Sequence, residues 1–264
     1  MLELKHISKT FYPGTVNAKT ALFDLNLTLN DGDFVTVIGG NGAGKSTMLN
    51  AIAGVFQVDT GKILIDGVDV TALPEYKRAK YIGRVFQDPM MGTAATMQIE
   101  ENLALAARRG KPRTLRPGIT KADREFYKEQ LRILDLGLED RMTTKVGLLS
   151  GGQRQALTLL MATLVTPKLL LLDEHTAALD PATAEKVLAL TKKIVAENHI
   201  TCLMITHNIP SALSLGNRTI MMNNGRIVLE LAGAERENMT TEQLLKVFHE
   251  QGVSNDRILF SAES

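Results

Sequence analysis

The segment GGNGAGKS at residues 39–46 restricts the fold of this 264-residue chain more than any other. It follows the apolar, β-branched run FVTVI at 34–38, which is typical of a buried strand. It precedes residues 46–53, which are typical of a helix, with Gly54 as its C-terminal cap. A glycine-rich turn from a buried strand into a helix begins a crossover between parallel strands. The sequence therefore predicts an α/β fold built on a mostly parallel sheet.

The rest of the chain alternates between strand-rich and helix-rich stretches. The first 30 residues are typical of short strands, and Asp66-Gly67 predicts a hairpin between 62–65 and 68–70. Further buried strands are predicted at 81–86, 168–173 and 200–206, and one more after residue 225. Because helical patterns separate most of these runs, the strands are expected to be joined by helices.

We expect one domain over residues 1–264. Its predicted parts are a parallel-sheet core with an N-terminal antiparallel β subdomain (1–87 and 166–230), an inserted helical subdomain (88–165), and a C-terminal helix with a tail (231–264). Within the insertion, Thr120 and Asp123 resemble a capping box. The helix that follows is expected to bury Phe126, Leu131, Leu134 and Leu138.

Composition weighs against several classes of function. The 30 basic and 29 acidic residues nearly cancel, so no global field favours nucleic acid. No apolar run reaches the roughly 18 residues that a membrane-spanning helix needs. The one cysteine, Cys202, lies in an apolar run and is expected to be a buried thiol. The basic cluster at 108–116 is interpreted as a solvated loop, with contact to an acidic partner or lipid headgroups as the alternative.

The segment 39–46 also has a chemical meaning, because it fits the P-loop pattern. Its glycines let several backbone N–H groups face one anion, and the following helix adds the partial positive charge of its N-terminus. In this pattern Lys45 reaches the β- and γ-phosphates of a nucleotide, and the Ser46 hydroxyl coordinates Mg²⁺. The sequence thus predicts a nucleoside triphosphate site.

A second predicted strand ends in two carboxylates. The run KLLLLDE at 168–174 places Asp173 and Glu174 at its end, pointing to opposite sides of the sheet. Asp173 suits a Mg²⁺ shell, with water between carboxylate and metal. Glu174 suits the base that polarises an attacking water. A helix-capping arrangement is the alternative, and the upstream P-loop favours the chemical role.

A third segment, LSGGQRQ at 149–155, supplies another helix N-terminus. Ser150 is predicted to cap a helix over 153–165, and the two glycines leave the N–H groups of its first turn open to an anion. With these motifs in this order, the chain resembles an ATP-binding cassette (ABC) domain, a P-loop NTPase of RecA-like fold. The resemblance extends from end to end, and LSGGQRQ is its most specific motif.

The resemblance implies a head-to-tail homodimer in which each ATP lies between one P-loop and the opposite signature segment. The implied ATP contacts at the P-loop are Gly39, Asn41, Gly42, Ala43, Gly44, Lys45, Ser46 and Thr47. Those implied across the dimer are Ser150, Gly151, Gly152, Gln153 and Asp180. Phe11 resembles the aromatic residue that stacks on adenine, with Tyr12 as the competing candidate. The implied metal contacts are Ser46, Gln87 and Asp173, and the implied catalytic groups are Lys45, Gln87, Glu174 and His207.

One position departs from the family pattern. His175 follows Glu174, where the family usually has proline. The change frees the backbone from the φ restriction of proline. A neutral substitution is the favoured interpretation, and an ionisable ring near the phosphates that tunes turnover with pH is the alternative.

The resemblance further implies a transporter subunit that uses ATP and Mg²⁺ at the cytoplasmic face of the membrane, as a peripheral partner of separate permease subunits. Import is favoured, because residues 143–148 lack the segment typical of exporters and no membrane helices are fused to the cassette. The form is similar to cassettes of bacterial amino-acid uptake systems, in particular the branch linked to aromatic amino acids. Such systems add an extracytoplasmic solute-binding protein. An exporter ATPase and a soluble ATPase of cofactor assembly are the alternatives.

Overall fold

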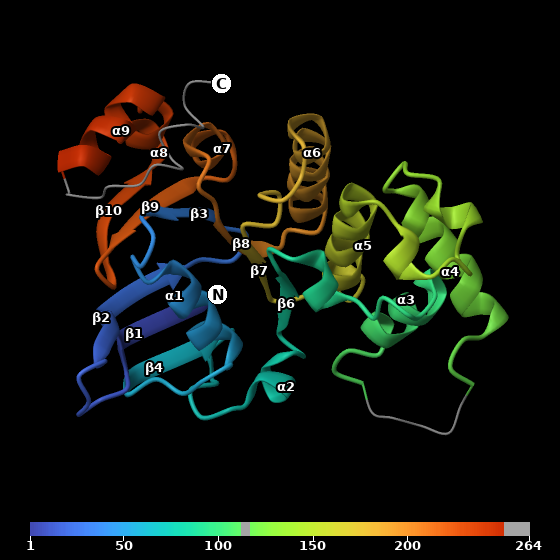
Figure 1. Ribbon diagram of the computed structural model, residues 1–264, viewed down its shortest axis with the longest axis horizontal. Helices are drawn as coiled ribbons and strands as arrows, with labels where there is room; N and C mark the ends of the chain where they lie inside the picture. The colour runs from blue at the N-terminus through green and yellow to red at the C-terminus, as the bar shows by residue number, and fades with distance from the viewer. Residues whose placement is uncertain (112–116, 251–264) are drawn as a thin grey trace. The chain divides into compact units, whose positions relative to one another are not determined.

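The computed structural model describes residues 1–111 and 117–250 of the chain (Figure 1). The chain forms two compact units: Met1–Arg78 with His199–Ser264, and Ala79–Asn198. We call them the P-loop unit and the signature unit, after the segments 39–46 and 149–155 that they contain. The predictions for the tail and for most of the basic cluster fall on 251–264 and 112–116, outside the described residues.

The P-loop unit begins with an antiparallel sheet. Its strands lie in the order β2-β1-β4-β5, with bounds Lys19–Leu29, Leu2–Phe11, Thr60–Ile65 and Val68–Asp69. The predicted hairpin is confirmed, since β4 pairs with β5 around the turn at Asp66-Gly67. Buried side chains such as Leu2, Leu4 and Leu22 cover the inner face of this sheet. Its alternation of buried and exposed residues is the pattern of a half-buried sheet.

The same unit holds four strands in the order β10-β9-β3-β8. Their bounds are Arg226–Ala232, Arg218–Asn223, Phe34–Gly39 and Thr201–Ile205. β3 pairs in parallel with both β8 and β9, as the sequence predicted for the core. Strand β9 was not predicted, and it pairs antiparallel with β10.

Helices of the P-loop unit follow its strands. The helix after the P-loop, α1, spans Lys45–Ala53, and Gly54 ends it in the left-handed conformation, as predicted. The C-terminal helix α9, Thr241–Glu250, is confirmed, whereas α7 (Ile209–Ser214) and α8 (Gly233–Glu237) were not predicted. Short helices like these give little periodic signal. The apolar cluster beneath them includes Ile38, Ile209, Met221, Leu231, Leu244 and Phe248.

A buried arginine stabilises the end of α1. Arg78, on the short helix α2 (Glu75–Arg78), is 1% exposed. Its guanidinium donates hydrogen bonds to the carbonyl oxygens of Ala51 and Ile52, each at 2.8 Å. It also donates to the carbonyls of Thr71 and Leu73. The cation therefore satisfies backbone groups at the C-terminal end of the P-loop helix, where the helix dipole favours positive charge.

A second buried charge network supports the start of β3. The carboxylate of Asp33 accepts hydrogen bonds from Asn217, Asn30 and Arg218 at 2.8–2.9 Å. Burial alone would raise the pKa of Asp33, but these hydrogen bonds outweigh it and lower the pKa below the ordinary value. Asp33 is therefore a buried anion that the fold depends on.

The described residues of the signature unit form two parallel strands and four longer helices. β6 (Ile82–Val85) pairs with β7 (Leu169–Asp173). The helices are α3 (Ile99–Ala107), α4 (Lys121–Arg132), α5 (Gly151–Thr163) and α6 (Pro181–Glu197). Between 88 and 165 the described residues form helices and turns, in agreement with the predicted pattern. That this stretch is an inserted subdomain stays a prediction.

Helix α4 corrects one detail of the sequence reading. Thr120 and Asp123 form the predicted capping box. However, Phe126 is 42% exposed, and its neighbour Tyr127 is the buried aromatic at 3%. Tyr127, Leu131 and Leu134 follow each other at intervals of four and three residues, so they share the buried side. Phe126 lies one position away from that side and was wrongly assigned to the core.

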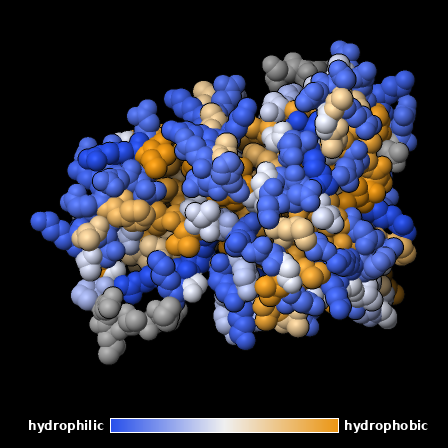
Figure 2. All heavy atoms as spheres, turned by 180° about the vertical axis from the view of Figure 1, so that it is seen from behind, coloured by the Kyte–Doolittle hydropathy of each residue, from blue (hydrophilic) through white to orange (hydrophobic). Residues whose placement is uncertain are grey.

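The surface agrees with the ordinary composition. None of the helices in the described part of the chain is long and apolar enough to cross a membrane. Figure 2 shows hydrophilic side chains over most of one face, with apolar ones interspersed. The Cys202 thiol is fully buried, as predicted, and burial raises its pKa.

Candidate functional site

The predicted site residues fall into two sets, one on each unit. In the P-loop unit, the loop 39–46 follows β3 and requires glycine at two positions. Gly39 and Gly44 have φ of +153° and +100°. A methyl group at position 39 would overlap the carbonyl oxygen of Met222, and one at position 44 would lie 2.6 Å from the carbonyl oxygen of Ala21. Close backbone approach therefore shapes the loop, and no larger residue fits without a shift.

The first turn of α1 presents the groups that can bind an anion. Gly44 precedes this turn and has no side chain with which to cap it. The start of a helix without a side-chain cap is suited to binding an anion. Lys45 is buried, and its ammonium donates hydrogen bonds to the carbonyl oxygens of Gly39 (2.7 Å) and Gly40 (3.0 Å). Ser46 is exposed and Thr47 is half-buried. These groups fit the phosphates of a nucleotide, and the Ser46 oxygen is a donor that Mg²⁺ accepts.

The aromatic candidates lie at the end of β1. Phe11 is half-buried, with its ring edge-on to Phe56 at 5.3 Å between centroids. The Lys9 ammonium lies 5.8 Å from the Phe11 ring and is paired with Asp59. Tyr12 is 70% exposed in the turn beyond. Phe11 is thus held by its neighbours at a defined angle, which favours it over Tyr12 as a stacking platform.

His207 completes the set on the P-loop unit. It follows β8, one residue beyond Thr206, and is half-buried. The next residue, Asn208, caps α7 through a hydrogen bond from the backbone N–H of Ser211. Because β8 pairs with β3, the residue after β8 and the P-loop follow the same carboxyl edge of parallel strands. That is the edge where ligands of α/β sheets bind.

In the signature unit, the predicted carboxylates end β7. Asp173 is its last residue, and Glu174 follows with a φ of +45°, which is unusual for a residue with a side chain. Arg84 on β6 was not predicted. Its guanidinium lies 3.9 Å from the Asp173 carboxylate and packs over the Phe86 ring. A cation at this distance favours the ionised carboxylate, the form that suits Mg²⁺.

The His175 ring points into the interior. It is 1% exposed, and its Nε2 lies 3.1 Å from the Thr191 hydroxyl. Because that hydroxyl donates to the Val187 carbonyl, it accepts from His175, so Nε2 carries the proton. The ring's Nδ1 has no hydrogen-bond partner among the described residues. Burial lowers the pKa of His175 to about 4, so the ring is neutral near pH 7. A buried, neutral imidazole does not tune turnover with pH near pH 7. The structure therefore favours the interpretation that histidine in place of proline at position 175 is a neutral substitution.

The signature segment is ordered by its own cap. Ser150 and Gln153 form a capping box: the Ser150 hydroxyl accepts from the Gln153 N–H, and the Gln153 side chain accepts from the Ser150 N–H. The predicted cap is confirmed, although the helix starts at Gly151 rather than at Gln153. Gly151 is exposed and Gly152 half-buried, so the first turn can be reached by a ligand.

Asp180 and the signature glycines are linked through one threonine. Asp180 caps α6 by accepting a hydrogen bond from the Thr183 N–H at 3.0 Å, and hydrogen bonds from the Thr183 side chain and N–H together lower the pKa of its carboxyl. The methyl group of Thr183 lies against Gly152, where an added side chain would overlap it. The start of α6 and the start of α5 therefore touch, and neither can shift without the other.

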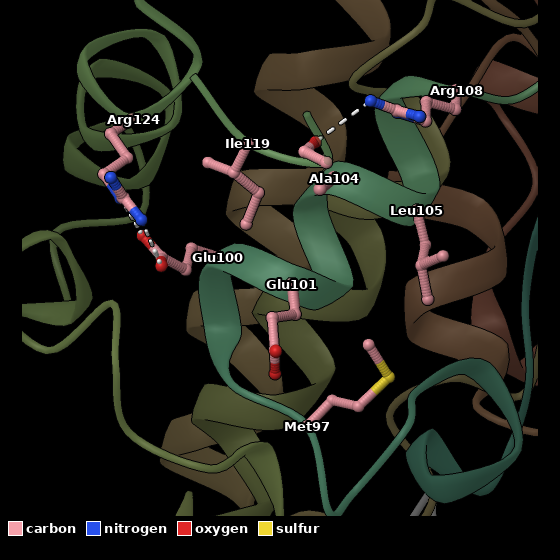
Figure 3. A pocket seen from close by; sticks show the side chains of 9 residues that line it. Met97, Glu100, Glu101, Ala104, Leu105, Arg108, Ile119 and Arg124 are labelled. Carbon is pink, nitrogen blue, oxygen red and sulfur yellow. Dashed lines mark hydrogen bonds and ion pairs between the residues drawn. The ribbon is translucent and has the colours of Figure 1, made fainter. Parts of the chain in front are cut away.

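A pocket opens in the same unit, beyond Gln87. Gln87 is exposed, just past the end of β6. The pocket has a volume of about 440 Å³ and is lined by residues of α3 together with Met97, Gly118, Ile119 and Arg124. Figure 3 shows Glu101 and Leu105 projecting from the same side of α3, and the Arg124 guanidinium on the Glu100 carboxylate. Leu105 is 58% exposed, so its apolar side chain is open to solvent or to a partner.

The family model described as ABC transporter matches residues 22–177, more than half of the chain. The chain belongs to the ABC transporter family. It is therefore an ATP-binding and ATP-hydrolysing cassette with a P-loop NTPase fold. It is similar to the ATP-binding cassette MJ0796 in a dimeric post-hydrolysis state bound to ADP and Pi, with a TM-score of 0.76 and 32% identity over 88% of this cassette and 98% of the other.

Two curated relatives come from uptake or transport systems. The tyrosine transport ATP-binding protein of Clostridioides difficile (strain R20291) is 45% identical over 94% of this cassette and 98% of the relative. The methionine import ATP-binding protein MetN of Corynebacterium efficiens (strain DSM 44549 / YS-314 / AJ 12310 / JCM 11189 / NBRC 100395) is 35% identical over 86% of the cassette. The cassette spans 61% of the length of that second relative.

Proposed function

We propose that this cassette hydrolyses ATP to drive uptake of amino acids, aromatic ones in particular, through separate permease subunits. The observation that supports this most is the 45% identity to a tyrosine transport ATP-binding protein over nearly the full length of both chains. None of the helices in the described part of the cassette could span a membrane, and in this proposal the permease subunits supply the pathway for the solute. A peripheral place at the cytoplasmic face and an extracytoplasmic solute-binding protein belong to the same proposal.

In this proposal the P-loop unit binds the nucleotide. Phe11 stacks on adenine, and the N–H groups of the loop with Lys45 hold the phosphates. On nucleotide binding, the Lys45 ammonium exchanges the carbonyls of Gly39 and Gly40 for phosphate oxygens. That exchange gives the cation a stronger, charge-assisted partner. His207 follows β8 and contacts the γ-phosphate.

The carboxylates of the signature unit serve the hydrolytic step. Glu174 accepts a hydrogen bond from the attacking water and thereby polarises it. Ser46, Gln87 and Asp173 would hold Mg²⁺, which neutralises phosphate charge when it is bound. The Arg84 guanidinium, 3.9 Å from the Asp173 carboxylate, helps to hold it in place for that role. The oxygen-rich donor set fits the preference of Mg²⁺ for hard ligands.

We propose a head-to-tail homodimer, in which Ser150, Gly151, Gly152 and Gln153 of one cassette contact the nucleotide of the other, with Asp180 at the interface. The exposed first turn of α5 supports this, because an anion-binding helix end needs a phosphate that another chain can supply. The dimeric state of the similar cassette MJ0796 supports it as well.

Glu174→Gln tests the assignment of the base. The amide keeps the shape of the side chain but loses its basicity, so we expect ATP binding within about threefold of wild type and a turnover reduced by 100-fold or more. Size-exclusion chromatography with ATP should show a trapped dimer. Glu129→Gln, an exposed glutamate on α4, is the matched control. Near-normal hydrolysis by the Glu174 variant would reject this role.

The pocket beside α3 is the proposed contact for the permease. Residues 87–105 run from the end of β6 to Leu105, an exposed residue of α3 that lines this pocket. We expect Leu105→Asp to lower transport at least tenfold while the ATPase activity of the isolated cassette stays within twofold. Val16→Asp, at a fully exposed position of the P-loop unit, is the control for a surface charge. Unchanged transport with Leu105→Asp would place the permease contact elsewhere.

Substrate class is tested by transport itself. Vesicles that hold the cassette, its permease and its binding protein are compared for uptake of tyrosine, phenylalanine, tryptophan and methionine. We expect ATP-dependent accumulation of the aromatic amino acids. Preference for methionine would agree with the 35% identical relative and contradict the aromatic assignment. ATP-dependent efflux would contradict import.

A further inference from the structure

A lysine outside the family motifs lies beside the P-loop. Lys19 is the first residue of β2 and is exposed. A methyl group built at Gly42, the third glycine of the loop, would lie 3.7 Å from the Lys19 ammonium nitrogen. Gly42 has a φ of +77° and is itself exposed, so the ammonium lies on the open side of the loop. A cation is thus placed next to backbone that is shaped to hold phosphate.

Strand pairing fixes the base of this side chain. Lys19 lies directly across from Phe11 in the antiparallel pair of β1 and β2. Residues that face each other in such a pair share one side of the sheet. The adjoining pair, Thr10 with Thr20, is joined by a hydroxyl–hydroxyl hydrogen bond of 3.1 Å, which confirms the register. Lys19 therefore extends on the side of the Phe11 ring, toward the loop that binds phosphate.

Two lysines of the neighbouring strand β1 are engaged differently from Lys19. Lys5 pairs with Glu3 at 2.5 Å, and Lys9 pairs with Asp59 at 2.8 Å. For Lys19, the residues that the structure describes provide no such carboxylate. An ammonium between an aromatic platform and a phosphate loop, without an acidic partner, is available to an anionic ligand.

We propose that Lys19 is a second phosphate-contacting cation of the nucleotide site, binding the phosphate chain from the solvent side while Lys45 binds from within the loop. This inference rests on the proposed nucleotide role of the P-loop unit. In this proposal Lys19 contacts the phosphates equally in the bound ground state and in the transition state, so it contributes to binding and not to the chemical step. Because Lys19 contacts the anionic phosphate chain, it does not distinguish one nucleotide base from another.

The test compares Lys19→Met with Lys19→Arg, and with Lys62→Met on β4 as the matched exposed-lysine control. We expect Lys19→Met to weaken binding of ATP and ADP by about threefold to tenfold, as one partly screened charge contact should. Binding of adenosine should be unchanged. Lys19→Arg keeps the charge and should bind ATP within twofold of wild type. In steady-state kinetics, KM for ATP should rise while kcat stays within twofold.

Two outcomes would overturn the role of Lys19. ATP affinity of Lys19→Met equal to that of Lys62→Met would show that the ammonium contacts no phosphate. An equal loss for ATP and adenosine would show that the substitution acts on the base or on the fold of the site. Failure of the wild-type chain to bind ATP would be a different result, because it would overturn the nucleotide role of the P-loop unit itself.

Discussion

Replacing Arg78 with methionine should reveal how much the end of the P-loop helix depends on a buried cation. The guanidinium donates hydrogen bonds to four main-chain carbonyls, and the side chain is 1% exposed. Leaving these four carbonyls, two buried and two part-buried, without this donor costs about 4 kcal/mol, at about 1 kcal/mol for each. Loss of positive charge at the end of α1 adds about 1 kcal/mol. Methionine recovers about 2 kcal/mol, because it fills the space with apolar atoms and buries no charge.

We therefore expect Arg78→Met to lower the free energy of unfolding by about 3 kcal/mol. Urea unfolding followed by circular dichroism measures the global change, and amide hydrogen exchange along α1 shows whether the helix end opens first. Lys77→Met removes an exposed charge one residue earlier and should change stability by less than about 0.5 kcal/mol. A loss below about 1 kcal/mol in the Arg78 variant, or unchanged exchange in α1, would refute the reasoning.

Two further substitutions test other close contacts of the P-loop unit. Gly44→Ala combines an unfavourable φ with overlap on the carbonyl oxygen of Ala21, so ATP affinity should fall at least tenfold. Gly14→Ala, the control, also has a positive φ but has open space around it, so ATP affinity should be unchanged in the same titration. Asp33→Asn should destabilise the protein by about 3 kcal/mol at pH 7, because it breaks a buried charged network. Since the folded-state pKa of Asp33 is lowered, its stabilisation is present above the ordinary pKa of about 3.9 and is lost as pH falls further. The stability gap between wild type and Asp33→Asn, measured by urea unfolding, should therefore narrow only below that pH, and a gap independent of pH would contradict the assignment.

The parts of the fold that were predicted are those that local sequence determines. The strand, glycine-rich turn and helix around 39–46 each have a local signal, and so do the caps at Thr120 and Ser150. A capping residue contacts groups only two or three positions away, so its neighbours in the sequence reveal it. The site motifs were located for the same reason.

What was missed depends on partners far away in the sequence. Arg78 bonds to Ala51 and Ile52, which lie 27 and 26 residues away, and no local pattern announces that contact. Arg84 meets Asp173 only because β6 and β7 pair in parallel. The direction of the His175 ring is set by Thr191, 16 residues away on α6, so the sequence left both interpretations open.

The contact between Gly152 and Thr183 also restricts the order in which these two residues can be substituted. A side chain at position 152 would overlap the threonine methyl, so Gly152→Ala alone is expected to displace the start of α5. If position 183 first became serine, which has no such methyl group, space for alanine at 152 would exist. Thr183→Ser followed by Gly152→Ala is therefore expected to be tolerated, whereas Gly152→Ala made first is expected to displace α5. The residue that the signature segment can hold at position 152 thus depends on residue 183, which lies outside that segment.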